Sequence, residues 1–382
     1  MADSDELFRT TVPGELVADL EHLDLITKEL KGLGIEPSVA ARDTTLGLAL
    51  LTGFDPAEEV LSSVLQELRR RFAGRCGGWV PVLGTNRTAD LIRPAGPKPM
   101  SEGEPGEAER ITIPQAAAGA FPVRVGVVDT ALYRHQSLPD SHVEADDRLG
   151  EPPPGTLRAG HGTFVASVIR AAAPAAHLVV EGVLKEDAGY TASGWAVAVA
   201  IASLARRVDI LNLSFGCFTA DGEPPLVIRR AIERVPAEVL VVAAAGNHGD
   251  VTGLVRGRTS RSPSWPAALP RVLAVGSSGL VGQEPRLKDP AGAELSEFTP
   301  RLPWVDCTIR GVDIHGAYPS DFHDGEGYTG WKTWSGTSFA AAAVTGALAK
   351  RMGERGVSAD EAVEQLEGAG VIRKFVLPEK NA

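Results

Sequence analysis

The sequence predicts an α/β protein in which a large three-layer domain, built on a parallel sheet, follows a small N-terminal α/β domain. From about Phe121 onward, near-continuous apolar segments alternate with helical stretches, which is typical of parallel strands buried between helices. The length of 382 residues also exceeds that of a usual single domain. We therefore divide the chain into an N-terminal domain over 1–93, a linker over 94–118 and a large domain over 119–382.

The N-terminal domain contains signals for both helices and strands. Apolar residues recur at helical spacing from Gly14 to Gly34, which predicts a helix there. The apolar run TLGLALL at 45–51 predicts a strand. A second helix is expected to begin near Pro56, because proline is favoured in the first helical turn. A further strand is expected at 79–83.

The segment between Arg93 and Arg110 is rich in proline, glycine and glutamate and contains hardly any apolar side chain. Such a segment buries too little surface to offset the loss of chain entropy on folding. It therefore predicts an acidic linker between the two domains.

The large domain is expected to contain five buried strands and five helices. The strands are VRVGVVD (123–129), HLVVEGVL (177–184), VDILNLSF (208–215), VLVVAAAG (239–246) and RVLAVGSS (271–278). The helices are expected at 163–170, 193–206, 226–234 and 338–352, followed by a final helix that begins at Ser358. Ser358 and Glu361 have the spacing of a capping box, which supports this last helix.

Composition narrows the range of functions. The net charge of −11 argues against nucleic acid or an anionic membrane as the main partner. Cys76, Cys217 and Cys307 form no CxxC pair, so neither a disulfide framework nor a zinc site is predicted. The acidic N-terminus lacks the features of a secretory signal, and no run of about 18 apolar residues is present. We expect a cytoplasmic protein that requires no cofactor.

Two polar residues stand where a parallel sheet collects reactive groups. Asp129 follows a buried strand and would lie at its carboxyl end, although an Asp there could equally cap a turn. His161 lies between two glycines at the start of an expected helix, where a structural cap is the alternative role. A carboxylate beside Nδ1 would fix the tautomer of this imidazole and stabilise its charged form.

Two more polar residues complete a possible hydrolytic site. Ser338 lies in SGTS at the start of an Ala-rich helix, so its backbone N–H could donate to a developing oxyanion. The alternative is a plain helix cap, for which Thr337 is also suited. Asn247 ends another strand and could donate its amide to the same oxyanion, or simply form a turn. The four sequence segments around Asp129, His161, Asn247 and Ser338 together predict a hydrolase that uses a nucleophilic side chain.

The same four blocks resemble the subtilisin-like serine proteases, whose reactive residues occur in the order Asp, His, Ser. The resemblance extends over about 120–350 and depends most on GHGT and on SGTS followed by the Ala-rich helix. It implies a subtilisin-like catalytic domain in which Asp129 orients the base and His161 is the general base and then acid. It further implies that Ser338 is the nucleophile and that Asn247 completes the oxyanion hole.

The resemblance also implies a groove that binds the substrate backbone as an added strand. The strand that pairs with the substrate and forms one wall of the groove corresponds to Leu213, Ser214, Phe215 and Gly216. The opposite wall corresponds to Ala244, Ala245 and Gly246. Since Phe215 and Cys217 would make the rim apolar, we expect an apolar or medium-sized residue before the scissile bond.

Two departures from the family pattern stand out. Phe164 occupies the position of a second histidine in many relatives. The chain is short over 167–174, where many secreted relatives bind calcium, so we predict no metal site there. The acidic residues Asp321, Asp324 and Glu326 are expected to form a solvated loop, with a different calcium site as the alternative.

Taken together, these features predict a cytoplasmic, bacterial serine endopeptidase that acts on a specific intracellular protein or peptide through an acyl-enzyme on Ser338. A catalytically silent relative that binds peptides in the same groove is the alternative. Three roles stay open for residues 1–93: a removable propeptide, a regulatory domain that binds a partner, or a structural brace.

Overall fold

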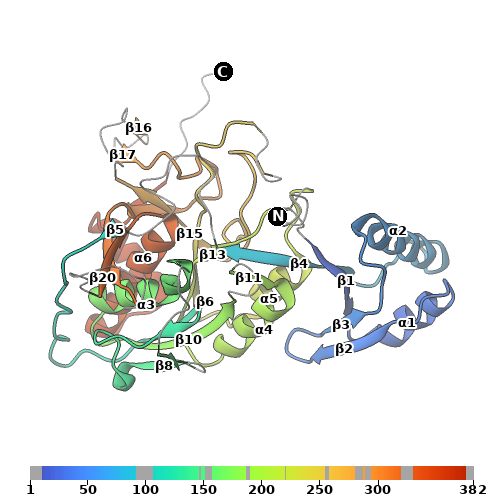
Figure 1. Cartoon of the computed structure of the whole chain (residues 1–382), viewed down its shortest axis with the longest axis horizontal. Helices are drawn as coiled ribbons and strands as arrows, with labels where there is room; N and C mark the ends of the chain where they lie inside the picture. The colour runs from blue at the N-terminus through green and yellow to red at the C-terminus, as the bar shows by residue number, and fades with distance from the viewer. Residues whose placement is uncertain are drawn as a thin grey trace.

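The computed structural model describes ten stretches of the chain. These are residues 11–91, 106–145, 148–150, 157–185, 190–219, 221–253, 258–279, 287–288, 294–319 and 330–375. They form two domains that share one sheet (Figure 1). The main apolar core extends from the large domain onto Val17, Leu48 and Leu50 of the N-terminal domain, which has a second core of its own on the other face of its sheet.

The N-terminal domain is an antiparallel sheet packed against two helices. Its elements in chain order are β1 (Thr11–Asp19), α1 (Leu23–Lys31), β2 (Ser38–Asp43), β3 (Leu48–Thr52), α2 (Glu58–Arg75) and β4 (Leu83–Leu91). The strands lie in the order β4-β1-β3-β2. Leu30 of α1 and Leu68 of α2 are fully buried against Leu51 of the sheet, so both helices share one core.

Two expectations for this domain need correction. The helix expected from Gly14 is wrong in its first part, since the chain up to Asp19 is strand β1 and α1 begins only at Leu23. β1 lies between β3 and β4, and this pairing on both edges overrides the helical spacing that begins at Leu16. The strand expected at 79–83 instead begins at Leu83, and strand β2 was missed. The helix expected near Pro56 is confirmed as α2.

The large domain contains the predicted parallel sheet. Its strands lie in the order β8-β10-β6-β12-β14-β15-β18, each parallel to its neighbours. Their bounds are β6 Arg124–Thr130, β8 Val143–Ala145, β10 His177–Leu184, β12 Ile210–Leu213, β14 Leu240–Ala244, β15 Val272–Ser278 and β18 Cys307–Arg310. All five strands expected from apolar runs are therefore confirmed. The antiparallel strands β16 (Leu287–Lys288), β17 (Glu294–Leu295) and β21 (Arg373–Lys374) extend the edge.

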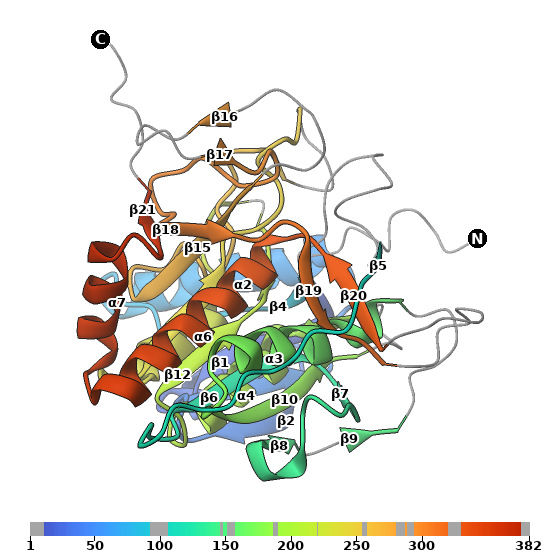
Figure 2. The ribbon, with the colours of Figure 1, turned by 90° about the vertical axis from the view of Figure 1, so that its left-hand side faces the viewer.

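Helices cover the sheet to give the predicted three layers. α3 (His161–Ala172) and α6 (Thr337–Arg355) lie side by side on one face (Figure 2). α4 (Gly194–Leu204) and α5 (Leu226–Arg234) pack against each other next to the N-terminal domain (Figure 1). α7 (Ala359–Gly368) begins with the expected capping box of Ser358 and Glu361. No helix in the described part of the chain is long and apolar enough to cross a membrane.

The two domains share a sheet because β4 pairs with short strands of the large domain. β4 is antiparallel to β11 (Thr191–Ser193) and to β13 (Phe215–Gly216). Residues 92–105, which include the linker residues 94–105, lie outside the described residues. Its strand β5 (Gly106–Glu107) pairs with β20 (Trp331–Trp334), which also pairs with β19 (Ile314–Ala317). The two-residue strands β7 (Leu132–Tyr133) and β9 (Arg148–Leu149) form a separate pair.

A glycine on α6 permits the close contact between α3 and α6. A Cβ on Gly346 would lie 2.6 Å from the Cβ of Ala172 and 2.9 Å from the carbonyl oxygen of Ile169. Gly346→Leu should therefore lower the free energy of unfolding by about 1–3 kcal/mol, measured by urea denaturation. Gly74→Ala is the matched control, because Gly74 lies in α2 with no atom near its missing Cβ. This control should raise stability by about 0.5–1 kcal/mol. Unchanged stability of Gly346→Leu would contradict the packing described here.

Candidate active site

The end of β6 and the start of α3 hold a carboxylate against an imidazole. Asp129 Oδ1 lies 2.7 Å from His161 Nδ1, and both side chains are buried. With Nδ1–H donating to the carboxylate, the other ring nitrogen, Nε2, is left to accept a proton.

Thr130 links the two segments that carry this pair. Its N–H donates to Asp129 Oδ1 over 2.7 Å, and its Oγ1 accepts the N–H of Gly162 over 2.8 Å. A Cβ on Gly162 would lie only 2.4 Å from the carbonyl oxygen of Thr130, so only glycine fits at this position. The glycine after His161 thus lets α3 begin directly against the end of β6.

Aromatic rings enclose the imidazole. The His161 ring lies 5.5 Å from that of Trp334 and 5.4 Å from that of Phe339, measured between centroids. Phe164 is fully buried and contacts both of these rings. A Cβ on Gly316 would lie 2.8 Å from the Phe164 ring. Where many relatives carry a second histidine, this chain therefore has a packing residue.

Ser338 lies in the first turn of α6 and is tied to the end of β12. Its Oγ donates to the carbonyl oxygen of Ser214 over 3.2 Å, and Ser214 Oγ donates to the carbonyl oxygen of Ser338 over 3.0 Å. Asn212 Nδ2 donates to Ser214 Oγ, and Thr345 Oγ1 donates to Asn212 Oδ1. Neither Asn212 nor Thr345 was predicted from the sequence as part of the site. Thr345 follows Ser338 by seven residues, which places both on one face of the helix.

The orientation of the Asn247 amide follows from its neighbours. Asn247 Oδ1 accepts the N–H and the hydroxyl of Thr337, each over 3.0 Å. Because a backbone N–H can only donate, the oxygen must face Thr337 and the NH₂ group must face away from it. Nδ2 lies 3.2 Å from the position that a Cβ on Gly336 would occupy, beside the start of α6. Thr337 makes no side-chain cap and instead positions Asn247.

The two segments expected to form groove walls leave neighbouring strands of the sheet. Leu213 pairs with Ala243 in the parallel ladder between β12 and β14, so Ser214 and Ala244 both follow that pair. Phe215 and Gly216 form β13, whose antiparallel partner is β4. Ala244, Ala245 and Gly246 continue β14 toward Asn247. The structure therefore gathers the residues expected in walls near the carboxyl ends of the central strands.

Metal-dependent and cysteine-dependent catalysis have less support among the described residues. One group of these residues, Asp19, Glu21 and His22 in the N-terminal domain, has the spacing of metal ligands. The acidic residues Asp321, Asp324 and Glu326 lie outside the described part. Burial raises the pKa of the Cys217 thiol to about 12, so this cysteine next to β13 is no thiolate nucleophile at neutral pH.

A serine at a helix start, near a buried carboxylate–imidazole pair on a parallel sheet, is the arrangement of a serine hydrolase. The chain belongs to the subtilase family, whose model matches residues 122–367. This confirms the predicted family and shows a subtilisin-like serine endopeptidase.

Curated relatives agree with this family. The chain is 29% identical to the major intracellular serine protease of Bacillus subtilis over 241 residues, or 59% of this chain and 67% of that protein. It is 28% identical to an intracellular serine protease of Paenibacillus polymyxa over 241 residues, or 59% of this chain and 65% of the relative. The chain thus spans about two thirds of each relative.

A solved structure shows that the fold likeness reaches beyond the large domain. Fervidolysin from Fervidobacterium pennivorans, described as a keratinolytic enzyme related to subtilisin, matches with a TM-score of 0.64 at 17% identity. The match covers 96% of this chain and 58% of fervidolysin. The predicted fold class is confirmed.

A buried histidine next to Asn247 should make stability depend on pH. His248 is fully buried, and burial lowers its pKa to about 4 from 6.5. As the pH falls from 6.5 to 4, the unfolded chain binds a proton that the folded chain does not, so folding loses about 3 kcal/mol. Urea denaturation at several pH values should show this loss in the wild type and not in His248→Leu. The exposed His315 provides the control variant His315→Leu, which should keep it. If the free energy of unfolding fell with pH by the same amount in wild type and His248→Leu, His248 would not be the cause of the pH dependence.

Proposed function

We propose that this endopeptidase cleaves peptide bonds through an acyl-enzyme on Ser338. The observation that carries the proposal is the buried contact of 2.7 Å between Asp129 and His161, close to the start of α6. His161 Nε2 takes the proton of Ser338 as Oγ attacks the substrate carbonyl, and then returns it to the leaving amine. Asp129 stabilises the imidazolium formed between these steps. Water then hydrolyses the acyl-enzyme.

The oxyanion of each tetrahedral intermediate needs donors in fixed positions. Asn247 Nδ2 and the backbone N–H of Ser338 are suited to this role, because Thr337 holds the Asn247 amide in one orientation. In the structure, Ser338 Oγ donates to Ser214 rather than to His161. Catalytic hydrogen bonds of this type often become well aligned only when substrate is bound.

For residues 1–93, we favour an inhibitory, propeptide-like role over a brace. The end of β4 lies between two strands of the large domain in the manner of a bound peptide. Its Thr88, Ala89 and Asp90 pair with β11, and Asp90 and Leu91 pair with β13. Since β13 directly follows Ser214, the carbonyl acceptor of Ser338 Oγ, β4 occupies the path of a substrate backbone.

Polar contacts hold the N-terminal domain on the start of α4. Asn86 is fully buried, its Oδ1 accepts the N–H of Trp195 over 3.0 Å, and its Nδ2 donates to Glu15 over 2.6 Å. A Cβ on Gly194 would lie 2.7 Å from the carbonyl oxygen of Arg87, so the strand approaches the helix closely. Arg87 also pairs with Asp221 over 3.1 Å.

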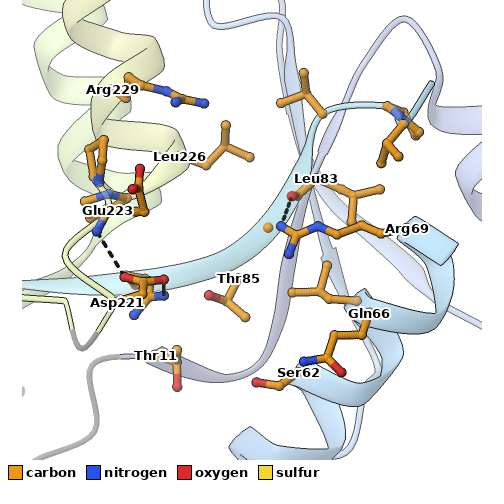
Figure 3. Close-up of a pocket in the computed structure, with 18 of the residues that line it drawn as sticks. Thr11, Ser62, Gln66, Arg69, Leu83, Thr85, Asp221, Glu223, Leu226 and Arg229 are labelled. Atoms are coloured by element: carbon orange, nitrogen blue, oxygen red, sulfur yellow. Dashed lines mark hydrogen bonds and ion pairs between the residues drawn. The ribbon is translucent and has the colours of Figure 1, made fainter. Parts of the chain in front are cut away.

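The same junction is not packed throughout. A polar cleft of about 630 Å³ lies between α2 and the start of α5 (Figure 3). Arg69 and Gln66 line it from α2, and Glu223 and Arg229 line it from the large domain. The junction is partly apolar, because Val17, Leu48 and Leu50 belong to the main core. The polar cleft reduces the packed area and so favours a domain that can be released, with the segment 94–118 as the connection to be cut.

We further propose an intracellular bacterial enzyme that processes a specific protein or peptide. The names of the two curated relatives support the location, since both are intracellular serine proteases of bacteria. The net charge of −11 supports protein substrates over nucleic acid or anionic membrane. The silent-binder alternative gains no support, because the Asp129–His161 pair is intact.

The nucleophile can be tested by labelling with a fluorophosphonate probe. Ser338→Ala should abolish labelling, because the probe reacts only with an activated serine hydroxyl. Ser335→Ala is the matched control in the same segment, since Ser335 Oγ only accepts the N–H of Asp313. It should keep labelling. Labelling that persists in Ser338→Ala, or is absent from the wild type both before and after cleavage at 94–118, would refute the proposed mechanism.

The inhibitory role can be tested by weakening the docking of the N-terminal domain. Asn86→Ala removes the buried hydrogen bond to the N–H of Trp195 across the junction, and also the bond to Glu15 within the N-terminal domain, so the full chain should be labelled roughly tenfold faster. Glu36→Ala is the control, because Glu36 pairs only with Lys31 on an exposed surface. If Asn86→Ala and wild type are labelled at equal rates, the N-terminal domain does not limit access of the probe to the groove.

A further inference from the structure

Two buried polar side chains next to the groove lack hydrogen-bond partners. His248 Nδ1 and Ser264 Oγ are both buried, and neither is hydrogen-bonded within the described part of the chain. Both face the same point beside Gly246. The position that a Cβ of Gly246 would occupy lies 2.7 Å from Nδ1 and 3.4 Å from Oγ. Buried groups of this kind are usually paired, so an unpaired couple calls for an explanation.

The chemistry of His248 Nδ1 follows from the other ring nitrogen. Nε2 lies 2.9 Å from the carbonyl oxygen of Ser262, and a carbonyl can only accept, so Nε2 carries the proton. Burial also lowers the pKa of His248 to about 4, which keeps the ring neutral at physiological pH. Nδ1 is therefore a hydrogen-bond acceptor. The Phe218 ring packs on the His248 ring with centroids 4.8 Å apart. The Arg258 guanidinium lies over the Phe218 ring, 4.9 Å from its centroid.

The register of β4 shows which substrate residue lies near this pair. Leu91 is opposite Phe215 and Asp90 is opposite Gly216. A substrate in the same register would place its next residue opposite Ser214, whose carbonyl accepts Ser338 Oγ. The carbonyl of that substrate residue is thus the one nearest the nucleophile.

His248 and Ser264 lie beside the two segments expected to form the walls of the groove. Cys217 and Trp265 exchange backbone hydrogen bonds of 2.9 and 3.0 Å, which brings Ser264 alongside the first wall. His248 follows Asn247 on the second wall. Because Gly246 has no side chain, nothing from that residue covers the two polar atoms.

We propose that His248 and Ser264 select a carboxamide side chain, glutamine or asparagine, at the substrate residue whose carbonyl is attacked. The amide N–H donates to His248 Nδ1, and the amide oxygen accepts the hydroxyl of Ser264. A carboxylate would place a lone pair against the lone pair of Nδ1, and an aliphatic side chain would leave both polar atoms unpaired. This inference rests on the proposed function, because it assigns specificity to the same groove.

The test compares three peptides that differ only in glutamine, glutamate or leucine at the attacked residue. The intact protein and the protein cut within 94–118 are each incubated with every peptide, because the N-terminal domain is proposed to block the groove. Cleavage is followed by mass spectrometry, and competition with fluorophosphonate labelling gives a second measure. Glutamine should be preferred over both others by at least tenfold in kcat/KM and in competition. Equal kcat/KM for the three peptides, or a higher value for leucine, would overturn the inference. It would indicate that ordered water satisfies the hydrogen bonds of His248 Nδ1 and Ser264 Oγ. Failure of the proposed function looks different, because labelling of the wild type would then be absent.

Variants separate specificity from folding. His248→Leu should reduce the ratio of glutamine to leucine cleavage at least tenfold while labelling of Ser338 persists. Should His248→Leu fail to fold, Ser264→Ala decides the question, since it removes one hydroxyl and should reduce the same ratio severalfold. His315→Leu is the matched control, because His315 is exposed on β19. Unchanged ratios in Ser264→Ala and in a folded His248→Leu would overturn the inference.

Discussion

The site depends on one close backbone contact, between the start of α3 and the end of β6. Gly162 approaches the carbonyl of Thr130 so closely that no side chain fits between them. This contact sets the distance between Asp129 and His161, residues that are 32 positions apart in the chain. Because α3 also packs on α6 through Gly346, the same arrangement ties the imidazole to the helix that carries Ser338. Small residues at two helix contacts thus bring three distant segments together.

The N-terminal domain depends on the large domain for part of its sheet. The sequence of β4, LGTNRTADL, is largely polar, and such a strand has little tendency to form on its own. The C-terminal half of β4 pairs with β11 and β13. This pairing covers strand edges of the large domain that would otherwise be exposed. The contact that satisfies the backbone of β4 is therefore the same one that, in the inhibitory role proposed above, would block the groove. In that role, occupation of the groove and protection of the sheet edge have a common physical origin.

Different parts of the structure could be predicted to different extents. Buried parallel strands such as β10 were predicted to the residue, because burial on both faces produces a continuous apolar run. β1 was not, since Leu16 also fits the helical spacing of the leucines that follow it, and only pairing with β3 and β4 decides the outcome. Asp129, His161 and Ser338 were found because each occurs in a distinctive local pattern. Thr337 and Asn212 act through neighbours brought near by folding, and no local pattern reveals such partners.

The groove illustrates the same limit for specificity. From the sequence, Phe215 and Cys217 suggested an apolar rim, yet Phe215 belongs to the main core and is fully buried. In a strand, adjacent side chains point to opposite faces, so a large residue in a wall need not face the bound peptide. In the specificity we propose, polar character comes from His248 and Ser264, which are 16 positions apart and meet beside Gly246. A residue without a side chain leaves these two polar groups facing one space, and chemical selectivity then depends on which of their hydrogen bonds a substrate can complete.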